Sequence, residues 1–202
     1  MASEPRGLAE ESELSLPASD PGGAPVEDGA GQDDAAESTR GMSAQKWKFV
    51  LPWVAAVVGL DVTTKMWIMN TMTLYERIPV LGDFFRLTYT HNPGAAFGLS
   101  VGDNSRIVFL ILSLAALALL CRFVWQTPIS DRLRLAALAT TCGGALGNAW
   151  DRIRLEAGVV DFLDFGIGDS RFPVFNVADS AVTVGAALLI ISFWLEERQR
   201  AH

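Results

Sequence analysis

Two aspartates, Asp161 and Asp179, stand in apolar stretches of the sequence where a charged side chain is costly. Asp161 follows two valines and precedes a phenylalanine, and Asp179 lies at the start of a long apolar run. An ionisable side chain at membrane depth usually has a partner, faces a wet cavity and takes part in function. Two carboxylates that lie close together need not both ionise. These two residues are therefore candidates for general acid and base chemistry.

On the residues alone, the two carboxylates could form a catalytic pair, a proton or ion relay, or structural ion pairs. Asp161 and Asp179 are 18 residues apart, which is about 27 Å along a single helix. They meet only if the chain reverses between them. Residues 166–170, which include two glycines, and Pro173 are strong turn signals at the right place.

Three further acids suit such a pair less well. Asp151 has Arg152 beside it, which indicates a structural network. Asp164 lies close to Asp161 in the sequence, and we expect it at the rim of the site. Asp169 belongs to the predicted turn, where we expect it to be solvated.

Other polar and small residues lie in or beside apolar stretches. Asp61 and Lys65 are four residues apart, on one face of a helix, and can form an ion pair. That pair could fix the position of the helix or contact substrate directly. Small side chains in residues 92–98, around Gly94, allow close approach of another backbone or form an ordinary turn. Those in residues 143–147 predict close helix packing.

Four stretches meet the length of about 20 residues that a helix needs to cross a bilayer. Tryptophans lie near their ends, as interfacial anchors do. The predicted spans are residues 47–69, 107–125, 133–150 and 174–195. The sequence thus predicts an all-α membrane protein with four transmembrane helices.

The loops and flanks of these spans set the expected topology. Short β-branched and aromatic runs in residues 78–81 and 86–90 predict a small extracytoplasmic β-sheet on the membrane surface. With the termini inside, eight Lys and Arg residues flank the inner ends of the spans and six flank the outer ends. The inner eight lie in shorter segments, so we expect both termini to be cytoplasmic. Residues 70–105 and 151–173 would then lie outside.

The first 40 residues differ from the rest of the chain. They hold ten acidic and two basic residues, a net charge of −8, so the total of −7 leaves +1 for the remainder. The net negative charge of the chain therefore comes from this tail, and the charge of the remainder gives no sign of a nucleic-acid partner. Rich in Gly, Ala, Ser and Pro, the tail is predicted to be disordered, with a four-helix domain at residues 41–202. It lacks the pattern of a secretory signal peptide.

Several other chemistries find little support. Cys121 and Cys142 both lie in apolar spans without a nearby histidine to activate a thiol. The two histidines are too few for a His-rich metal site, and no phosphate-binding loop occurs. We expect no cofactor and no metal. The main alternative is a small proton- or ion-coupled transporter that uses the buried carboxylates as a relay, which would show flux and no proteolysis.

Five motifs, in order, are similar to those of the bacterial lipoprotein signal peptidases, or signal peptidase II, over about residues 47–197. They are Asp61-x-x-x-Lys65, Asn92-Pro93-Gly94-Ala95-Ala96-Phe97, the run of residues 143–152 ending in Asn148-Ala149-Trp150-Asp151-Arg152, Val159-Val160-Asp161-Phe162, and Phe175-Asn176-Val177-Ala178-Asp179-Ser180. The acidic tail has no counterpart in the family pattern. The turn at residues 152–158 is about one residue longer than usual.

The resemblance implies an aspartic endopeptidase in the bacterial cytoplasmic membrane, with its active site near the outer face. Asp161 and Asp179 would be the catalytic pair. Substrate-binding or supporting roles would fall to Asn92, Gly94, Asn148, Asp151, Arg152, Asn176, Asp61 and Lys65. The implied substrate is a prolipoprotein, cleaved just before its diacylglyceryl-modified cysteine. We expect a monomer surrounded by membrane lipid.

Overall fold

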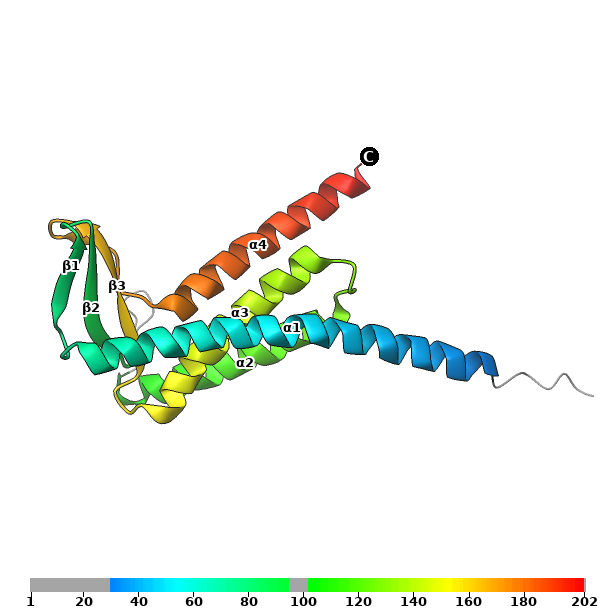
Figure 1. Ribbon diagram of the computed structural model, residues 1–202, viewed down its shortest axis with the longest axis horizontal. Helices are drawn as coiled ribbons and strands as arrows, with labels where there is room; N and C mark the ends of the chain where they lie inside the picture. Colours follow the sequence, from blue (N-terminus) through cyan, green and yellow to red (C-terminus); the bar gives the residue numbers. More distant parts are fainter. Residues whose placement is uncertain (1–29, 95–101, 202) are drawn as a thin grey trace, which may run out of the picture. The chain divides into compact units, whose positions relative to one another are not determined.

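The structure is a computed structural model that describes residues 30–94 and 102–201. Contacts divide the chain into residues 1–37 and residues 38–202, and the second unit contains the features described below. Its order of elements is helix, hairpin, two helices, hairpin, helix (Figure 1). Helix α1 spans Ala30–Thr71, so residues 30–40, expected in a disordered tail, are helical. Residues 1–29 of that predicted tail lie outside the described residues.

Three helices in the described part of the chain are long and apolar enough to cross a membrane. They are the segment Ala44–Thr71 of α1, helix α2 at Ser105–Gln126 and helix α4 at Val177–Arg200. At 1.5 Å per residue, the shortest of them reaches about 33 Å, enough for the hydrocarbon core of a bilayer. Large apolar side chains on all three helices are exposed. A helix that is apolar on every face suits lipid.

Helix α3, Arg132–Arg154, coincides with the third predicted span but is not among the helices apolar enough to qualify. Helix α3 is less apolar because it lies among the other helices. Helices α2 and α4 pack against it, and α1 contacts it at Gly143. Half of its residues are buried, and many of these are Ala, Gly or Thr. Side chains that face other helices can be polar when they find partners there. The prediction of a small-residue packing face at residues 143–147 is confirmed.

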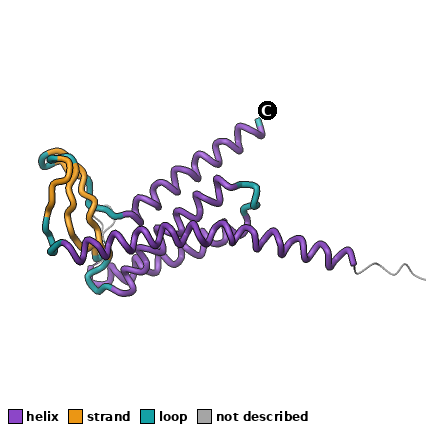
Figure 2. Tube along the Cα trace, in the orientation of Figure 1, coloured by secondary structure: helices purple, strands orange, loops and turns teal. Residues whose placement is uncertain are grey.

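A four-stranded antiparallel sheet lies at one end of the helices (Figure 2). Strands β1 (Arg77–Leu81) and β2 (Phe85–Asn92) form the hairpin that the sequence predicted. Strand β3 (Val159–Ile167) pairs with β2, and the short β4 (Ser170–Arg171) pairs with β3. A 3₁₀ turn, η1 (Gly102–Asn104), leads into α2. Because β3 comes directly after α3 and β4 leads into α4, the sheet joins the helices that carry the polar residues.

Two glycines bring backbone segments close together near this junction. Gly158 has φ = +95°, and a Cβ there would collide with the carbonyl of Asn92. Gly94 has φ = +116°, and a Cβ there would meet the backbone of Ser105. Both positions need glycine for conformation and for space. The predicted close approach is therefore present at Gly94, while residues 95–98 of that motif lie outside the described residues.

Candidate active site

Helix α4 begins with a side-chain cap that contains one of the two candidate acids. The Asn176 side chain accepts a hydrogen bond from the backbone N–H of Asp179, at 2.9 Å. The Asp179 carboxylate in turn accepts one from the backbone N–H of Asn176, at 3.1 Å. This reciprocal capping box satisfies backbone donors that the first helical turn leaves unpaired. It also fixes the Asp179 side chain at the end of the helix that faces β3.

Asp161 lies on strand β3 and reaches the same asparagine. The side-chain nitrogen of Asn176 donates to the Asp161 carboxylate at 2.6 Å, and also to the carbonyl oxygen of Val160 at 3.2 Å. On the neighbouring strand β2, Thr90 pairs opposite Asp161. Asn92 is two residues further along and so lies on the same face, where its side chain hydrogen-bonds Asp161. The turn between β3 and α4 thus brings the two acids to one residue, Asn176, as the chain reversal predicted.

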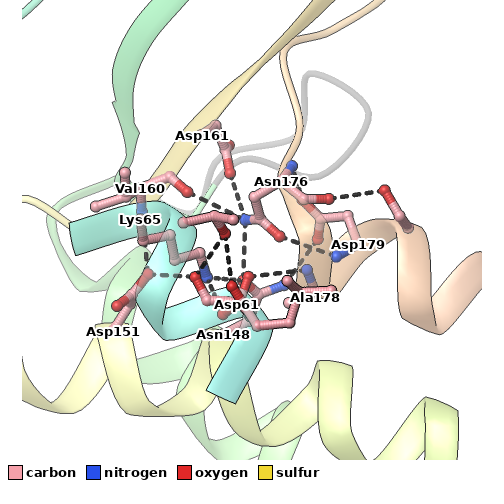
Figure 3. Close-up of polar contacts among 12 residues, drawn as sticks. Asp61, Lys65, Asn148, Asp151, Val160, Asp161, Asn176, Ala178 and Asp179 are labelled. Atoms are coloured by element: carbon pink, nitrogen blue, oxygen red, sulfur yellow. Dashed lines mark hydrogen bonds and ion pairs between the residues drawn. The ribbon is translucent and has the colours of Figure 1, made fainter. Parts of the chain in front are cut away.

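Asn148 on helix α3 forms a second bridge between these groups. Its side-chain nitrogen donates to Asp179 at 2.7 Å, and its side-chain oxygen accepts from Asn176 at 3.0 Å. The same oxygen accepts a hydrogen bond from Lys65 of α1, at 3.0 Å. Side chains from α1, α3, β3 and α4 therefore form one connected network (Figure 3).

Beneath this network lies a buried cluster of charges. Lys65 forms ion pairs with Asp61 at 2.7 Å and with Asp151 at 3.0 Å, and all three side chains are fully buried. The other oxygen of Asp61 accepts a hydrogen bond from the backbone N–H of Ala178, in the first turn of α4. Asp151 accepts the backbone N–H of Val160. The predicted ion pair of Asp61 and Lys65 is confirmed, and it connects the starts of β3 and α4 to α1.

Glycines on α3 allow this close approach. A Cβ on Gly147 would collide with the Asp61 carboxylate, and one on Gly144 would collide with the carbonyl oxygen of Ala178. A larger residue at either position would separate α3 from α1 or α4. The small-residue run therefore sets the spacing at which the polar groups can meet.

The environment of Asp161 favours its protonated form. It is only 3% exposed, and burial, together with the negative charge of Asp179, raises the pKa of Asp161 to about 7. The hydrogen bond from Asn176 and the charge of Lys65 oppose this shift. Asp179 is partly exposed. An acid that remains protonated near neutral pH, beside a more exposed second carboxylate, can provide both general acid and general base.

The remaining predicted site residues occupy different places. Asp151 belongs to a structural network, as expected, but its side chain pairs with Lys65 and Arg154 rather than with Arg152. Arg152 donates to the backbone carbonyl of Asn148 at 3.2 Å and acts electrostatically on both Asp161 and Asp179.

Two other acids stand outside the network. Asp164 forms an ion pair with Arg171 at 2.6 Å and accepts a hydrogen bond from Thr88, at 2.6 Å. It is buried rather than at a rim, and it stabilises the sheet. Asp169 is exposed in the turn between β3 and β4, as expected.

Some contributors were missed from the sequence. The backbone N–H groups of Val160 and Ala178 bind buried carboxylates, and no sequence pattern identifies such roles. Arg154 could have been found, because it lies three residues after Asp151 on the same helix. Among the residues that the structure describes, no group of three or more His, Cys, Asp or Glu side chains is placed to hold a metal ion.

Comparison with known proteins identifies the family. Residues 53–195 match the family model described as signal peptidase (SPase) II. The chain belongs to the signal peptidase II family. A lipoprotein signal peptidase of Halothermothrix orenii is 42% identical over 145 residues, which cover 72% of this chain and 94% of the relative. One of Geobacter sulfurreducens is 44% identical over 151 residues, which cover 73% and 94%.

Solved structures agree with this family. A bacterial membrane enzyme has a TM-score of 0.65 and 32% sequence identity, over 73% of this chain and 88% of that chain. A second bacterial membrane enzyme gives 0.63 and 34%, over 71% and 91%. The resemblance stated from the motifs is therefore confirmed, and the chain is a peptidase and a multi-pass bacterial membrane protein. The transporter predicted as the alternative is not favoured.

Proposed function

We propose that this protein removes the signal peptide from prolipoproteins, with Asp161 and Asp179 as its catalytic pair. The relatives reported above bear the name lipoprotein signal peptidase, which supports cleavage just before a diacylglyceryl-modified cysteine. The observation that carries the residue assignment is the position of Asn176. Its side chain hydrogen-bonds Asp161 while its backbone hydrogen-bonds Asp179.

The reaction needs one protonated and one ionised carboxyl group. The ionised group takes a proton from a water molecule as the water oxygen adds to the carbonyl carbon of the scissile bond. The protonated group gives its proton to the carbonyl oxygen, and a tetrahedral diol forms. The diol collapses when the C–N bond breaks and the newly protonated carboxyl group transfers its proton to the leaving amine. At the same time one diol hydroxyl returns its proton to the other carboxylate, which forms the carboxyl group of the product and restores the starting protonation of the pair. No covalent intermediate with the protein is required.

The other predicted residues have supporting roles in this proposal. Asn92 and Asn148 each hydrogen-bond one of the two acids. Arg152 lies near both acids, and its Nε is buried without a hydrogen-bond partner among the described residues, so we assign it to the substrate peptide. The other predicted residues hold these side chains in place and have no direct contact with substrate in this proposal. They are Gly94, Asp61, Lys65 and Asp151.

For the membrane, we propose four crossings, with α3 as the additional one. The network lies where α3 ends and α4 begins, which is the end of the helices that carries the sheet. The Lys and Arg distribution favours cytoplasmic termini. Together these observations support an active site near the outer face of the cytoplasmic membrane.

We further propose that the sheet lies on the membrane surface. A groove of about 550 Å³ on the sheet is lined by aromatic and apolar side chains together with Gly166 and Ser170. Phe84, Phe172 and Ile167, which line it, are 55%, 61% and 74% exposed. An exposed apolar patch of this kind can mark a site of contact with a membrane. Such a surface suits contact with lipid headgroups and acyl chains.

The domain division that we propose is an N-terminal tail, residues 1–40, and a peptidase domain, residues 41–202. The family match begins at residue 53, which supports a tail without a part in catalysis. We propose that the peptidase acts as a monomer with membrane lipid as its surroundings.

The test is cleavage of an acylated precursor by the purified full chain. We expect a shortened product from the wild type, none from Asp161→Asn or Asp179→Asn, and normal cleavage by Asp169→Asn, the control at an exposed turn. Each variant must unfold at a temperature close to that of the wild type. Full activity in either dyad variant, or equal cleavage of a precursor without the lipid, would contradict the proposal.

A further inference from the structure

The two candidate acids differ in the donors that surround them, and Asp179 is the better placed to carry a negative charge. One of its oxygens accepts the backbone N–H of Asn176 at 3.1 Å, and a backbone N–H can only donate. Asp179 also lies in the first turn of α4, where the helix dipole stabilises an anion. Its other oxygen is 2.7 Å from the side-chain nitrogen of Asn148.

Asn148 donates to Asp179 only when its amide nitrogen, and not its oxygen, faces that carboxylate. The nitrogen and oxygen of an amide exchange places when the group flips, so the surroundings must decide. Here the Asn148 oxygen lies 3.0 Å from the ammonium of Lys65, which has donors only. In the flipped state the amide nitrogen would face that ammonium, and Asp179 would face an oxygen.

A second amide confirms the same arrangement independently. The orientation of Asn176 is set by two backbone groups, because its oxygen accepts the N–H of Asp179 at 2.9 Å and its nitrogen donates to the carbonyl of Val160 at 3.2 Å. The nitrogen of Asn176 therefore also donates to the oxygen of Asn148, at 3.0 Å. The Asn176 nitrogen has two hydrogens for three acceptors, the side-chain oxygens of Asp161 and Asn148 and the carbonyl of Val160, so two of these acceptors share one hydrogen.

Asp161 has a different environment. It is 3% exposed on a strand, without the helix N-terminus that favours the anion at Asp179. Its hydrogen bonds come from the side chains of Asn176 and Asn92, and a neutral carboxylic acid retains lone pairs that can accept both. Burial and the negative charge of Asp179 raise the pKa of Asp161 to about 7.

We infer that the proton shared by the pair resides on Asp161 and that Asp179 is the base that activates water. This inference rests on the proposed function, because it assigns roles within the proposed catalytic pair. Two charged side chains of neighbouring elements act on the pair: Lys65 of α1, which itself pairs with Asp61 and Asp151, and Arg152 of α3. His91 of β2 pairs opposite Val160, so it lies on the other face of the sheet from Asp161.

Infrared difference spectroscopy on the full chain in detergent tests where the proton lies. At about pH 6, solvated carboxyl groups are ionised, so a C=O stretching band of a protonated acid reports a buried one. We expect Asp161→Asn to abolish a band that titrates near pH 7 in the wild type. Asp179→Asn should retain this band with a lower midpoint, because the repelling charge is gone. Bands from other buried acids cancel in the difference spectra.

The opposite pattern would overturn the inference. A band that survives in Asp161→Asn and disappears in Asp179→Asn would place the proton on Asp179, and the absence of any pair-dependent band would mean that both acids are ionised. Because the spectra require no cleavage, they remain informative if the pair is not catalytic. Normal cleavage by the dyad variants would then contradict the proposed function while the proton assignment stands.

Discussion

Asn176 is the residue on which both acids depend. Its side-chain oxygen caps α4, and its side-chain nitrogen binds Asp161. Its backbone N–H binds Asp179. A single substitution there affects helix stability and the chemistry together, unless the new side chain can perform one task without the other.

Serine at position 176 should separate these two tasks. A serine hydroxyl is a good N-cap, whereas Asn176→Ala should lower helix stability by about 0.5–2 kcal/mol. Neither side chain can reach Asp161 from this position. We therefore expect Asn176→Ser to unfold near the wild-type temperature but to cleave precursor about tenfold more slowly, the scale of one lost hydrogen bond to a buried group.

Thermal unfolding and single-turnover cleavage of the two variants provide the measurement. A serine variant with wild-type cleavage would show that the contact between Asn176 and Asp161 is dispensable.

The pH dependence of cleavage follows from Asp161. Its pKa is raised to about 7 by burial and by the charge of Asp179. The protonated form is the acid that the proposed reaction needs, and it is present below that pH and lost above it. We expect kcat/KM to fall about tenfold per unit as pH rises beyond about 7. The measurement is kcat/KM as a function of pH, with the binding of an unlipidated precursor as the control. A value of kcat/KM that stays constant up to pH 9 would contradict this expectation.

At the scale of elements, the site depends on how closely α3 approaches α1 and α4. Gly144 and Gly147 leave no room for a Cβ at these contacts. The buried ion pairs of Lys65 lie across the same interface. Removing one partner of a buried pair leaves an uncompensated charge, which is strongly destabilising. Helix spacing and charge pairing therefore support each other.

Alanine substitutions at two glycines distinguish this spacing from ordinary helix propensity. Gly147→Ala should lower the unfolding temperature and reduce cleavage, because its methyl group would enter the space of the Asp61 carboxylate. Gly59→Ala on α1 meets nothing within 4 Å, so it should be neutral or stabilising by up to about 1 kcal/mol. Equal effects of the two changes on unfolding temperature would rule out the spacing argument.

The sequence predicted the acids, the turn between them and the first hairpin, because each has a local signal. The strand β3 was not predicted, since its pairing with β2 is a long-range contact. Helix α3 was predicted as a span of the same kind as the others, but it is buried by other helices, and local hydropathy does not reveal that. The partner of Asp151 was misjudged because Arg152 is adjacent in sequence but not on the same helical face.

At the scale of the whole molecule, both the helices and the sheet expose large apolar side chains. The exposed faces of α1, α2 and α4 carry large apolar side chains, and so does the groove that includes Phe84 and Phe172. The polar network lies between these two regions, where β3 leads into α4. This arrangement suits a substrate whose lipid remains in the bilayer while its peptide reaches the carboxylates.

Fluorescent labels can test the position of the sheet. With Cys121 and Cys142 replaced by serine, a label on Phe172→Cys should be quenched by brominated lipid in vesicles. A label on Asp169→Cys, in the exposed turn, should be quenched less. The physical reason is that the apolar groove favours the interface. Equal, weak quenching at both positions would place the sheet away from the lipid.

The cap at the start of α4 has a consequence for biosynthesis. Asp179 occupies the third position of that helix and Asn176 precedes its first turn, so the acids cannot be arranged until the helix has wound. Because α4 follows every other contributing element in the chain, the proposed catalytic pair can form only when the final helix has inserted. We therefore expect a nascent chain to be inert toward neighbouring precursors, and fraying of this one turn to silence the mature enzyme.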